Sequence, residues 1–154
     1  MKRFSELVEA GRQRVAEIYP WDLAKCLESP DVPLVLDVRE PYEFDTMHIA
    51  GSLQVPRGIL ESACEWGYEE TVPELVQARE REVVVICRSG NRSVLAADVL
   101  LSLGYSRVVS LRTGLRGWND YEQPLVDREG NRVPLEVADD YFMPKVAKHQ
   151  LGPR

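Results

Sequence analysis

Short apolar runs alternate with longer amphipathic stretches along most of the chain. Four runs are rich in Val, Ile and Leu and too short for helices: residues 34–38, 52–55, 83–87 and 107–111. Three stretches place apolar side chains at helical spacing: residues 71–81, 93–103 and 115–121. Continuous apolar strands are typical of a parallel sheet buried on both faces. Strands that alternate with helices therefore predict an α/β fold with a parallel sheet.

Two further helices are predicted before the first strand. Residues 3–18 carry apolar side chains between charged ones, which predicts an amphipathic helix with Gly11 as its weak point. Pro20 opens the next helix, because its fixed φ angle suits a first helical turn. Gly104 follows the 93–103 stretch and suits the left-handed conformation in which helices often end.

The alternation of strands and helices stops near Leu125. Residues 126–133 predict a small hairpin that turns at 129–131, and prolines beyond it limit the length of any helix. We divide the chain into a helical N-terminal extension (1–14), one domain (15–125) and a C-terminal extension (126–154). We expect the C-terminal extension to pack on the domain or on a partner subunit.

Composition and charge narrow the class of protein. The chain has 154 residues, of which 44% are hydrophobic and 29% charged, so its core needs no disulfide or metal. A net charge of -6 and the lack of a Lys/Arg run argue against nucleic-acid binding. No apolar stretch approaches the ~20 residues of a membrane-spanning helix, and none forms a secretory signal. We expect a cytoplasmic protein that does not bind membranes, and its oligomeric state stays open.

The chain has only three cysteines, which is an odd number. We therefore expect reduced thiols rather than a set of disulfide bonds. No Cys-x-x-Cys or His-x-x-x-His pair indicates a zinc site. Cys26 lies on a predicted helix and is expected to be core or half-exposed. Cys64 lies where it could be exposed, and a role as a relay thiol stays open.

The most informative segment joins a buried strand to a helix through Cys87. Ligands of α/β proteins sit where parallel strands end, and a helix N-terminus offers free N–H groups there. Gly90 allows backbone angles that turn successive amides inward as an anion nest. Arg88 and Arg92 add positive charge beside the sulfur. These features favour the thiolate of Cys87 and predict a reactive nucleophile.

This segment resembles the six-residue active-site loop of rhodanese sulfurtransferases. Four motifs follow the order of that family: Leu36-Asp-Val-Arg39 with Tyr42-Glu43-Phe44 after it, His48-Ile-Ala-Gly51-Ser-Leu53, Cys87-Arg-Ser-Gly-Asn-Arg92 and Thr113-Gly-Leu-Arg-Gly-Trp118. Ser52 replaces the usual alanine of the second motif. The resemblance spans roughly residues 15–125. It implies one rhodanese domain, with a parallel five-stranded sheet and helices on both faces.

The resemblance also implies sulfur transfer through a persulfide on Cys87. The thiolate attacks the outer sulfur of thiosulfate or of another persulfide, and sulfite or a thiol leaves. A thiophilic acceptor then takes the sulfur: cyanide in an assay, or a thiol or sulfur-carrier protein in a cell. This exchange requires no general base and no cofactor.

Each remaining residue of the loop receives an expected role. Arg88 is expected to point toward the pocket mouth and to bind an anionic donor. Arg92 is expected to bring positive charge to the pocket. Ser89, Gly90 and Asn91 are expected to bind substrate through their backbone N–H groups.

Residues around the loop have mainly structural interpretations. Ser93, counted with the substrate-binding loop, is a candidate helix N-cap. Asp37 and Arg39 end a neighbouring strand and either line the same edge or, preferably, form an ion pair that fixes the loop. His48 is expected to be a hydrogen-bonded structural histidine, and Trp118 to pack the last helix on the sheet.

Other functions stay open beside this one. Cysteine phosphatases and arsenate reductases use Cys-x5-Arg, whereas Arg92 lies five residues after Cys87, so this loop is one residue shorter. A shorter loop suits one transferred sulfur better than a phosphoryl group. A non-catalytic binding module of this kind usually lacks the loop cysteine. A sulfur carrier that holds a persulfide for a partner is a variant of the main hypothesis.

Overall fold

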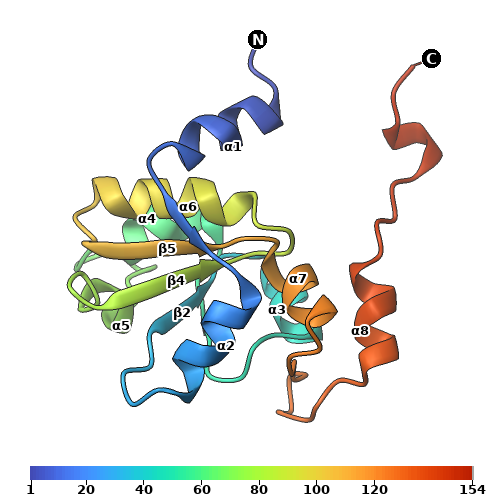
Figure 1. Cartoon of the computed structure of the whole chain (residues 1–154). Coiled ribbons are helices and arrows are strands. Elements are labelled where there is room, and N and C mark those ends of the chain that lie inside the picture. Colours follow the sequence, from blue (N-terminus) through green and yellow to red (C-terminus); the bar gives the residue numbers. More distant parts are fainter. Residues whose placement is uncertain (154) are drawn as a thin grey trace.

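The computed structural model describes residues 1–153 and has a central sheet of five strands (Figure 1). Its strands are β1 (Ala16–Ile18), β2 (Leu34–Asp37), β3 (Leu53–Gln54), β4 (Glu82–Ile86) and β5 (Arg107–Leu111). They lie in the order β1-β5-β4-β2-β3, and all four neighbouring pairs are parallel. The predicted α/β fold with a parallel five-stranded sheet is confirmed.

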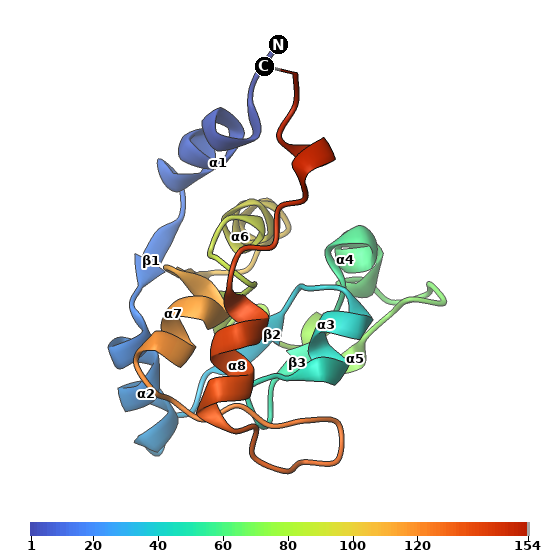
Figure 2. The ribbon, with the colours of Figure 1, turned by 90° about the vertical axis from the view of Figure 1, so that its right-hand side faces the viewer.

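Helices cover both faces of this sheet (Figures 1 and 2). The α-helices are α1 (Phe4–Arg12), α2 (Pro20–Glu28), α3 (Pro41–Thr46), α4 (Leu60–Ala63), α5 (Pro73–Val76), α6 (Arg92–Ser102), α7 (Gly114–Asp120) and α8 (Leu135–Phe142). Two short 3-10 helices are η1 (Arg57–Ile59) and η2 (Lys148–Gln150). One core joins the sheet to α1, α4, α5 and α6, and the other joins it to α2, α7 and α8.

The predicted helix over 3–18 is wrong in its second half. Helix α1 ends at Arg12, and β1 pairs in parallel with β5 at the edge of the sheet. A strand of three residues has no apolar run of its own, and pairing with β5 makes it a strand. Gly11 brings α1 close to α6, because a Cβ atom there would lie 3.0 Å from Val94 Cγ1.

The helices predicted from Pro20 onward agree with the structure except for one, whereas α3 and α4 were not predicted. Helices α2, α6 and α7 begin within one residue of the predicted starts, and Gly104 adopts the left-handed φ of +90° after α6. The stretch 71–81 forms only the short helix α5. Single turns follow it, such as the one in which Arg81 N donates to Ala78 O, before β4 begins.

The C-terminal extension contains the predicted hairpin and one unpredicted helix. Val126 and Arg132 form an antiparallel bridge, with Gly130 at a φ of +84° in the turn. Helix α8 then packs against α7 through its buried residues Ala138 and Phe142.

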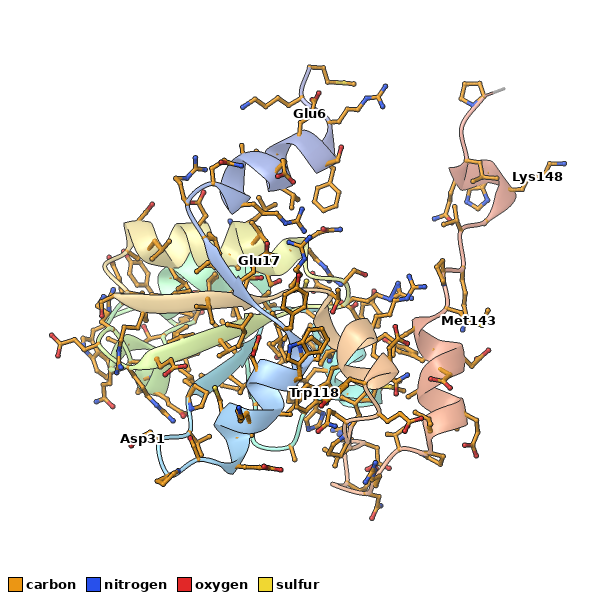
Figure 3. All side chains as sticks on the ribbon, viewed as in Figure 1. Glu6, Glu17, Asp31, Trp118, Met143 and Lys148 are labelled. Carbon is orange, nitrogen blue, oxygen red and sulfur yellow. The ribbon has the colours of Figure 1, made fainter. Side chains whose placement is uncertain are left out.

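Beyond α8 the chain continues away from the sheet (Figures 1 and 2). The side chains of Met143 and Lys148 stand apart from the body of the domain (Figure 3), and Met143 is 60% exposed. Among residues 1–153, no helix has the length and apolar character that a membrane crossing requires.

Candidate active site

The loop that contains Cys87 lies at the carboxyl edge of the sheet, between β4 and α6. Its first carbonyls are held by α7, because Leu115 N donates to Cys87 O at 2.9 Å and Arg116 N to Arg88 O at 3.0 Å. Gly114 makes this contact possible. Its φ is +61°, and a Cβ atom there would lie 2.6 Å from the backbone of both Cys87 and Arg88. The motif around Gly114 therefore supports the Cys87 loop from the first turn of α7.

Polar groups surround the sulfur of Cys87, which is only 1% exposed. Gly90 N donates to Sγ at 3.1 Å and Ser93 N at 3.3 Å, while Ser93 Oγ lies 3.3 Å from Sγ. The hydroxyl of Ser110, on β5, donates to Ser93 Oγ at 2.8 Å. A thiolate or persulfide at this position would receive hydrogen bonds from a fixed set of donors, which stabilises negative charge.

These contacts refine the roles expected from sequence. Ser93 is not the N-cap: Asn91 takes that position, and the Ser93 side chain is buried beside the sulfur. The N–H groups that reach Sγ are those of Gly90 and Ser93, and no such bond to Ser89 or Asn91 is found within residues 1–153. The sequence analysis did not predict a role for Ser110. A serine within an otherwise apolar strand could have indicated one.

Arg92 points to Glu43, on α3, rather than standing free in the pocket. Its two terminal nitrogens donate to the two carboxylate oxygens at 2.8 and 2.9 Å. Burial alone would raise the pKa of Glu43, but hydrogen bonds from Arg92 and from Glu40 N, with the charges of Arg92 and Arg39, hold it below its ordinary value. The hydrogen bond with Glu43 raises the pKa of Arg92. The positive charge expected from Arg92 is thus balanced by a carboxylate, whose role the sequence did not reveal.

Arg88 points to the C-terminal extension. Its Nη2 atom donates to Tyr141 O at 3.4 Å and to Met143 O at 3.3 Å, and its guanidinium lies 6.0 Å from the Phe142 ring. These carbonyls lie at the C-terminal end of α8, where the helix dipole is negative. Arg88 therefore ties the loop to the C-terminal extension and lines the cavity between them, and its expected role in binding an anionic donor stays a prediction.

Asp37 and Arg39 form a fully buried ion pair with an N–O distance of 2.8 Å. Arg39 also donates to the carbonyls of Met47, at 2.8 Å, and of Glu43, at 3.4 Å. These contacts join the end of β2 to α3, the helix that carries Glu43. The geometry agrees with an ion pair that fixes the site and does not touch the sulfur.

The other residues singled out from sequence lie away from Cys87. His48 Nδ1 is 2.8 Å from Phe44 O and its ring stacks on Phe44, as expected of a structural histidine. Trp118 is buried between α7 and the sheet. Cys64 is fully buried, and burial raises the pKa of its thiol, so the expected exposure of Cys64 is wrong. Cys26 is half-buried on α2, and burial raises its pKa as well.

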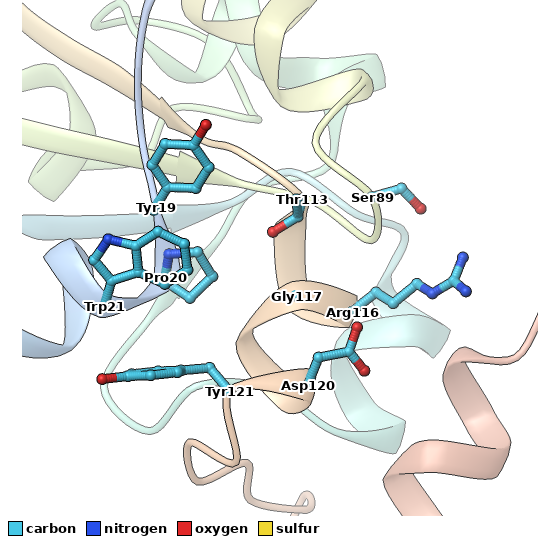
Figure 4. A pocket seen from close by; sticks show the side chains of 9 residues that line it. All are labelled: Tyr19, Pro20, Trp21, Ser89, Thr113, Arg116, Gly117, Asp120 and Tyr121. Carbon is cyan, nitrogen blue, oxygen red and sulfur yellow. The ribbon is translucent and has the colours of Figure 1, made fainter.

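Two cavities flank the loop. One, of about 540 Å³, is open beside Ser89 and has aromatic walls that include Tyr19, Trp21 and Tyr121 (Figure 4). Tyr19 and Trp21 stack with ring centroids 4.7 Å apart. The other cavity, of about 630 Å³, lies between α3, Arg88 and the C-terminal extension. Its walls are formed by Tyr42, Glu43, Arg88, Tyr141, Met143, Pro144, Lys145, Val146 and Gln150.

A parallel α/β domain with one cysteine at the end of its central strand, cradled by loop amides, defines a class of group-transfer proteins. The Rhodanese-like domain family matches residues 20–121, and the chain belongs to this family.

Its relatives include proteins of sulfur transfer. The chain is 33% identical to a sulfurtransferase of Allochromatium vinosum over 116 residues, which cover 75% of this chain and 99% of that protein. It is 32% identical to the thiosulfate sulfurtransferase GlpE of Tolumonas auensis, covering 62% of this chain and 79% of GlpE. It is also 32% identical to the putative sulfur carrier protein YrkF of Bacillus subtilis, covering 54% of this chain and 40% of YrkF.

A solved structure agrees with this assignment. The rhodanese-related protein of Thermoplasma volcanium superposes with a TM-score of 0.59 at 30% identity, over 72% of this chain and 97% of that one. Family and relatives together support a role in sulfur transfer and the sulfurtransferase class.

Proposed function

We propose that the protein moves a sulfane sulfur from thiosulfate or another persulfide to a thiophilic acceptor, through a persulfide on Cys87. The observation that carries this proposal is the cradle around Sγ, formed by the N–H groups of Gly90 and Ser93 and by the Ser93 hydroxyl. The cradle stabilises negative charge on Sγ, or on a sulfur bound to it, without any general base. Residues 15–125 would form the catalytic domain, to which the two extensions are added.

The proposed reaction has two exchanges on sulfur. The Cys87 thiolate attacks the outer sulfur of the donor, a new S–S bond forms, and the donor's own S–S bond breaks. Its electron pair leaves with sulfite or with a thiolate. An acceptor thiolate, on a small molecule or on a carrier protein, then attacks the outer sulfur of Cys87 and restores its thiolate. The transferred atom keeps its oxidation state, so no external oxidant or reductant is needed.

The position of Arg92 argues against the phosphatase alternative. An arginine that binds a phosphoryl group needs its guanidinium fork free to face the phosphate oxygens. Both terminal nitrogens of Arg92 donate to Glu43 instead. The presence of Cys87 in a complete cradle also favours a catalytic or carrier role over a non-catalytic binding module.

Intact mass after incubation with thiosulfate tests this function, with sulfite release measured in parallel. We expect wild type to gain the mass of one sulfur atom and Cys87→Ala to gain none. Cys64→Ala and Cys26→Ala are the matched controls and should load like wild type. If wild type gains no sulfur from thiosulfate or from an organic persulfide, the proposal fails and a binding module is the better interpretation. Transfer from loaded protein to an added thiol distinguishes an enzyme that turns over from a carrier.

A further inference from the structure

The two halves of the Cys87 loop are held in different ways. Backbone N–H groups of α7 hold the carbonyls of Cys87 and Arg88, at 2.9 and 3.0 Å. The second half, residues 89–91, contains Gly90, whose N–H donates to Sγ at 3.1 Å. Among residues 1–153, the hydrogen bond that reaches this half from another element comes from Arg12, whose Nη2 donates to Asn91 Oδ1 at 3.5 Å. Because that bond is long, the Arg12 guanidinium needs a second contact to hold it in place.

Glu17 supplies this second contact from strand β1, which leads from α1 toward α2 (Figure 3). Arg12 Nε lies 3.3 Å from Glu17 Oε1 and 3.5 Å from Oε2. Arg112 Nη1 donates to the same Oε1 atom at 3.1 Å. The Glu17 side chain is only 12% exposed, so water screens these contacts less than it would at the surface. A carboxylate between two guanidinium groups offsets their mutual repulsion and holds both in place.

Arg112 connects the other side of Gly90 to this carboxylate. Arg112 N donates to Ile18 O at 2.8 Å, so its backbone as well as its side chain is tied to β1. The next residue, Thr113, packs against Gly90, because a Cβ atom at Gly90 would lie 2.9 Å from Thr113 N. The residues on both sides of Gly90 are therefore linked to one carboxylate on β1.

We propose that Glu17 is a positioning residue for sulfur transfer, and that through its two arginines it fixes the direction in which Gly90 N–H faces the sulfur. The proposal rests on the proposed function of Cys87 and adds to it a residue outside the family match at 20–121. Glu17 acts through other residues and does not contact Sγ itself. A donor N–H that moves out of line loses most of its hydrogen bond, and with it the stabilisation of negative charge on the sulfur.

A second ion pair of the same extension provides a matched control. Arg14, between α1 and β1, donates to both carboxylate oxygens of Asp98 on α6, at 2.8 and 2.7 Å. This pair also ties the N-terminal extension to α6, the helix that follows the Cys87 loop. Neither of its members hydrogen-bonds to the loop within residues 1–153. Asp98→Ala therefore loosens the extension without removing the contacts of Glu17.

Hydrogen exchange of the Gly90 amide, followed by NMR in the full-length protein, tests the positioning without any reaction. In Glu17→Ala this amide should exchange at least about tenfold faster than in wild type, because its bond to Sγ is weakened. Glu17→Gln keeps an oxygen that can accept from both arginines but loses the charge, so its rate should lie between the two. Asp98→Ala should match wild type. Wild-type exchange in Glu17→Ala, or equal acceleration in Asp98→Ala, would overturn the proposal. If urea unfolding shows that Glu17→Ala does not fold, the comparison of Glu17→Gln with Asp98→Ala decides.

Single-turnover loading of Cys87 from thiosulfate, followed by intact mass, tests the consequence for transfer. We expect loading to slow about tenfold in Glu17→Ala and about threefold in Glu17→Gln, with the wild-type rate in Asp98→Ala. Wild-type loading in Glu17→Ala would overturn a role of Glu17 in transfer. If wild type itself loads neither from thiosulfate nor from an organic persulfide, the proposed function fails. The exchange of the Gly90 amide would then still decide whether Glu17 positions this N–H.

Discussion

Cys87 and Cys64 are both buried, yet their surroundings differ in kind. Cys64 lies in the apolar core beneath α6, where burial raises the pKa of its thiol. Cys87 ends the central strand, and backbone N–H groups of Gly90 and Ser93 point at its sulfur. Burial therefore does not decide whether a thiol can react. Directed hydrogen-bond donors do, because they replace water as the solvent of a thiolate.

The largest expected effect is a difference in reactivity between these two cysteines. With iodoacetamide at neutral pH, Cys87 of the native protein should be alkylated at least about a hundredfold faster than Cys64, because the thiolate is the nucleophile. Mass mapping of peptides at successive times measures both rates in one sample. Unfolding in urea is the control, and there the two cysteines should react at similar rates. Similar alkylation rates for Cys87 and Cys64 in the native protein would show that the hydrogen-bond donors around Cys87 do not increase its reactivity.

Gly114→Ala should remove the support of the Cys87 loop. A Cβ atom at this position would meet the backbone of Cys87 and Arg88 at 2.6 Å, and the φ of +61° disfavours alanine as well. We expect a loss of about 2 kcal/mol in the free energy of unfolding and at least about a tenfold loss in the rate of Cys87 loading. Gly58→Ala is the matched control, because nothing lies within 4 Å of its added Cβ and its φ is not positive. Urea unfolding and loading that match Gly58→Ala would contradict this prediction.

Ser110→Ala should weaken the cradle without touching the sulfur directly. Ser110 donates to Ser93 Oγ at 2.8 Å, which leaves the Ser93 hydroxyl free to donate to a thiolate 3.3 Å away. Without that contact the hydrogen bond from Ser93 that stabilises negative charge on Sγ should weaken, and alkylation of Cys87 at pH 7 should slow about threefold to tenfold. Ser102→Ala, on the exposed side of α6, is the control. An alkylation rate equal to that of Ser102→Ala would contradict this prediction.

Glu43→Gln should give the smallest effect, on stability and its pH dependence. The folded pKa of Glu43 is lowered, so its ion pair stabilises fully above the ordinary glutamate pKa of about 4.3 and less as pH falls through the folded value. We expect wild type to be about 1 kcal/mol more stable at pH 7, with a difference that shrinks below about pH 4.3. Urea unfolding across pH measures this, with exposed Glu69→Gln as the control. A difference that persists unchanged at pH 3 would contradict the ion-pair account.

The same variant tests how charge beside Cys87 affects the approach of an anionic donor. Releasing Arg92 from Glu43 supplies positive charge near Cys87, so thiosulfate should load Glu43→Gln several-fold faster than wild type. Loading from the persulfide of 2-mercaptoethanol, which carries less charge, should change less. An unchanged rate with thiosulfate would mean that Arg92 does not limit the approach of this donor.

Local pattern predicted most of the central sheet and the Cys87 loop between a strand and a helix, because buried strands and helix starts leave short-range signatures. Strand β1 escaped prediction because its three residues have no apolar run, and only pairing with β5 makes them a strand. The orientation of Arg88 depends on carbonyls of Tyr141 and Met143, more than fifty residues away in the chain. The pairing of Arg92 with Glu43 is likewise non-local. Contacts of this kind are set by tertiary packing and leave no mark in a short window of sequence.

The polar backbone groups of the Cys87 loop face two different neighbours, helix α7 and the sulfur of Cys87. Its carbonyls at Cys87 and Arg88 accept N–H groups of α7, and the N–H groups of Gly90 and Ser93 face the sulfur. Main-chain groups persist whatever side chain stands at positions such as Ser89. Side chains of the loop that contact incoming molecules can therefore be substituted in evolution while the backbone groups around the sulfur stay in place. Related proteins can then keep the same surroundings of the sulfur while they accept sulfur from different donors.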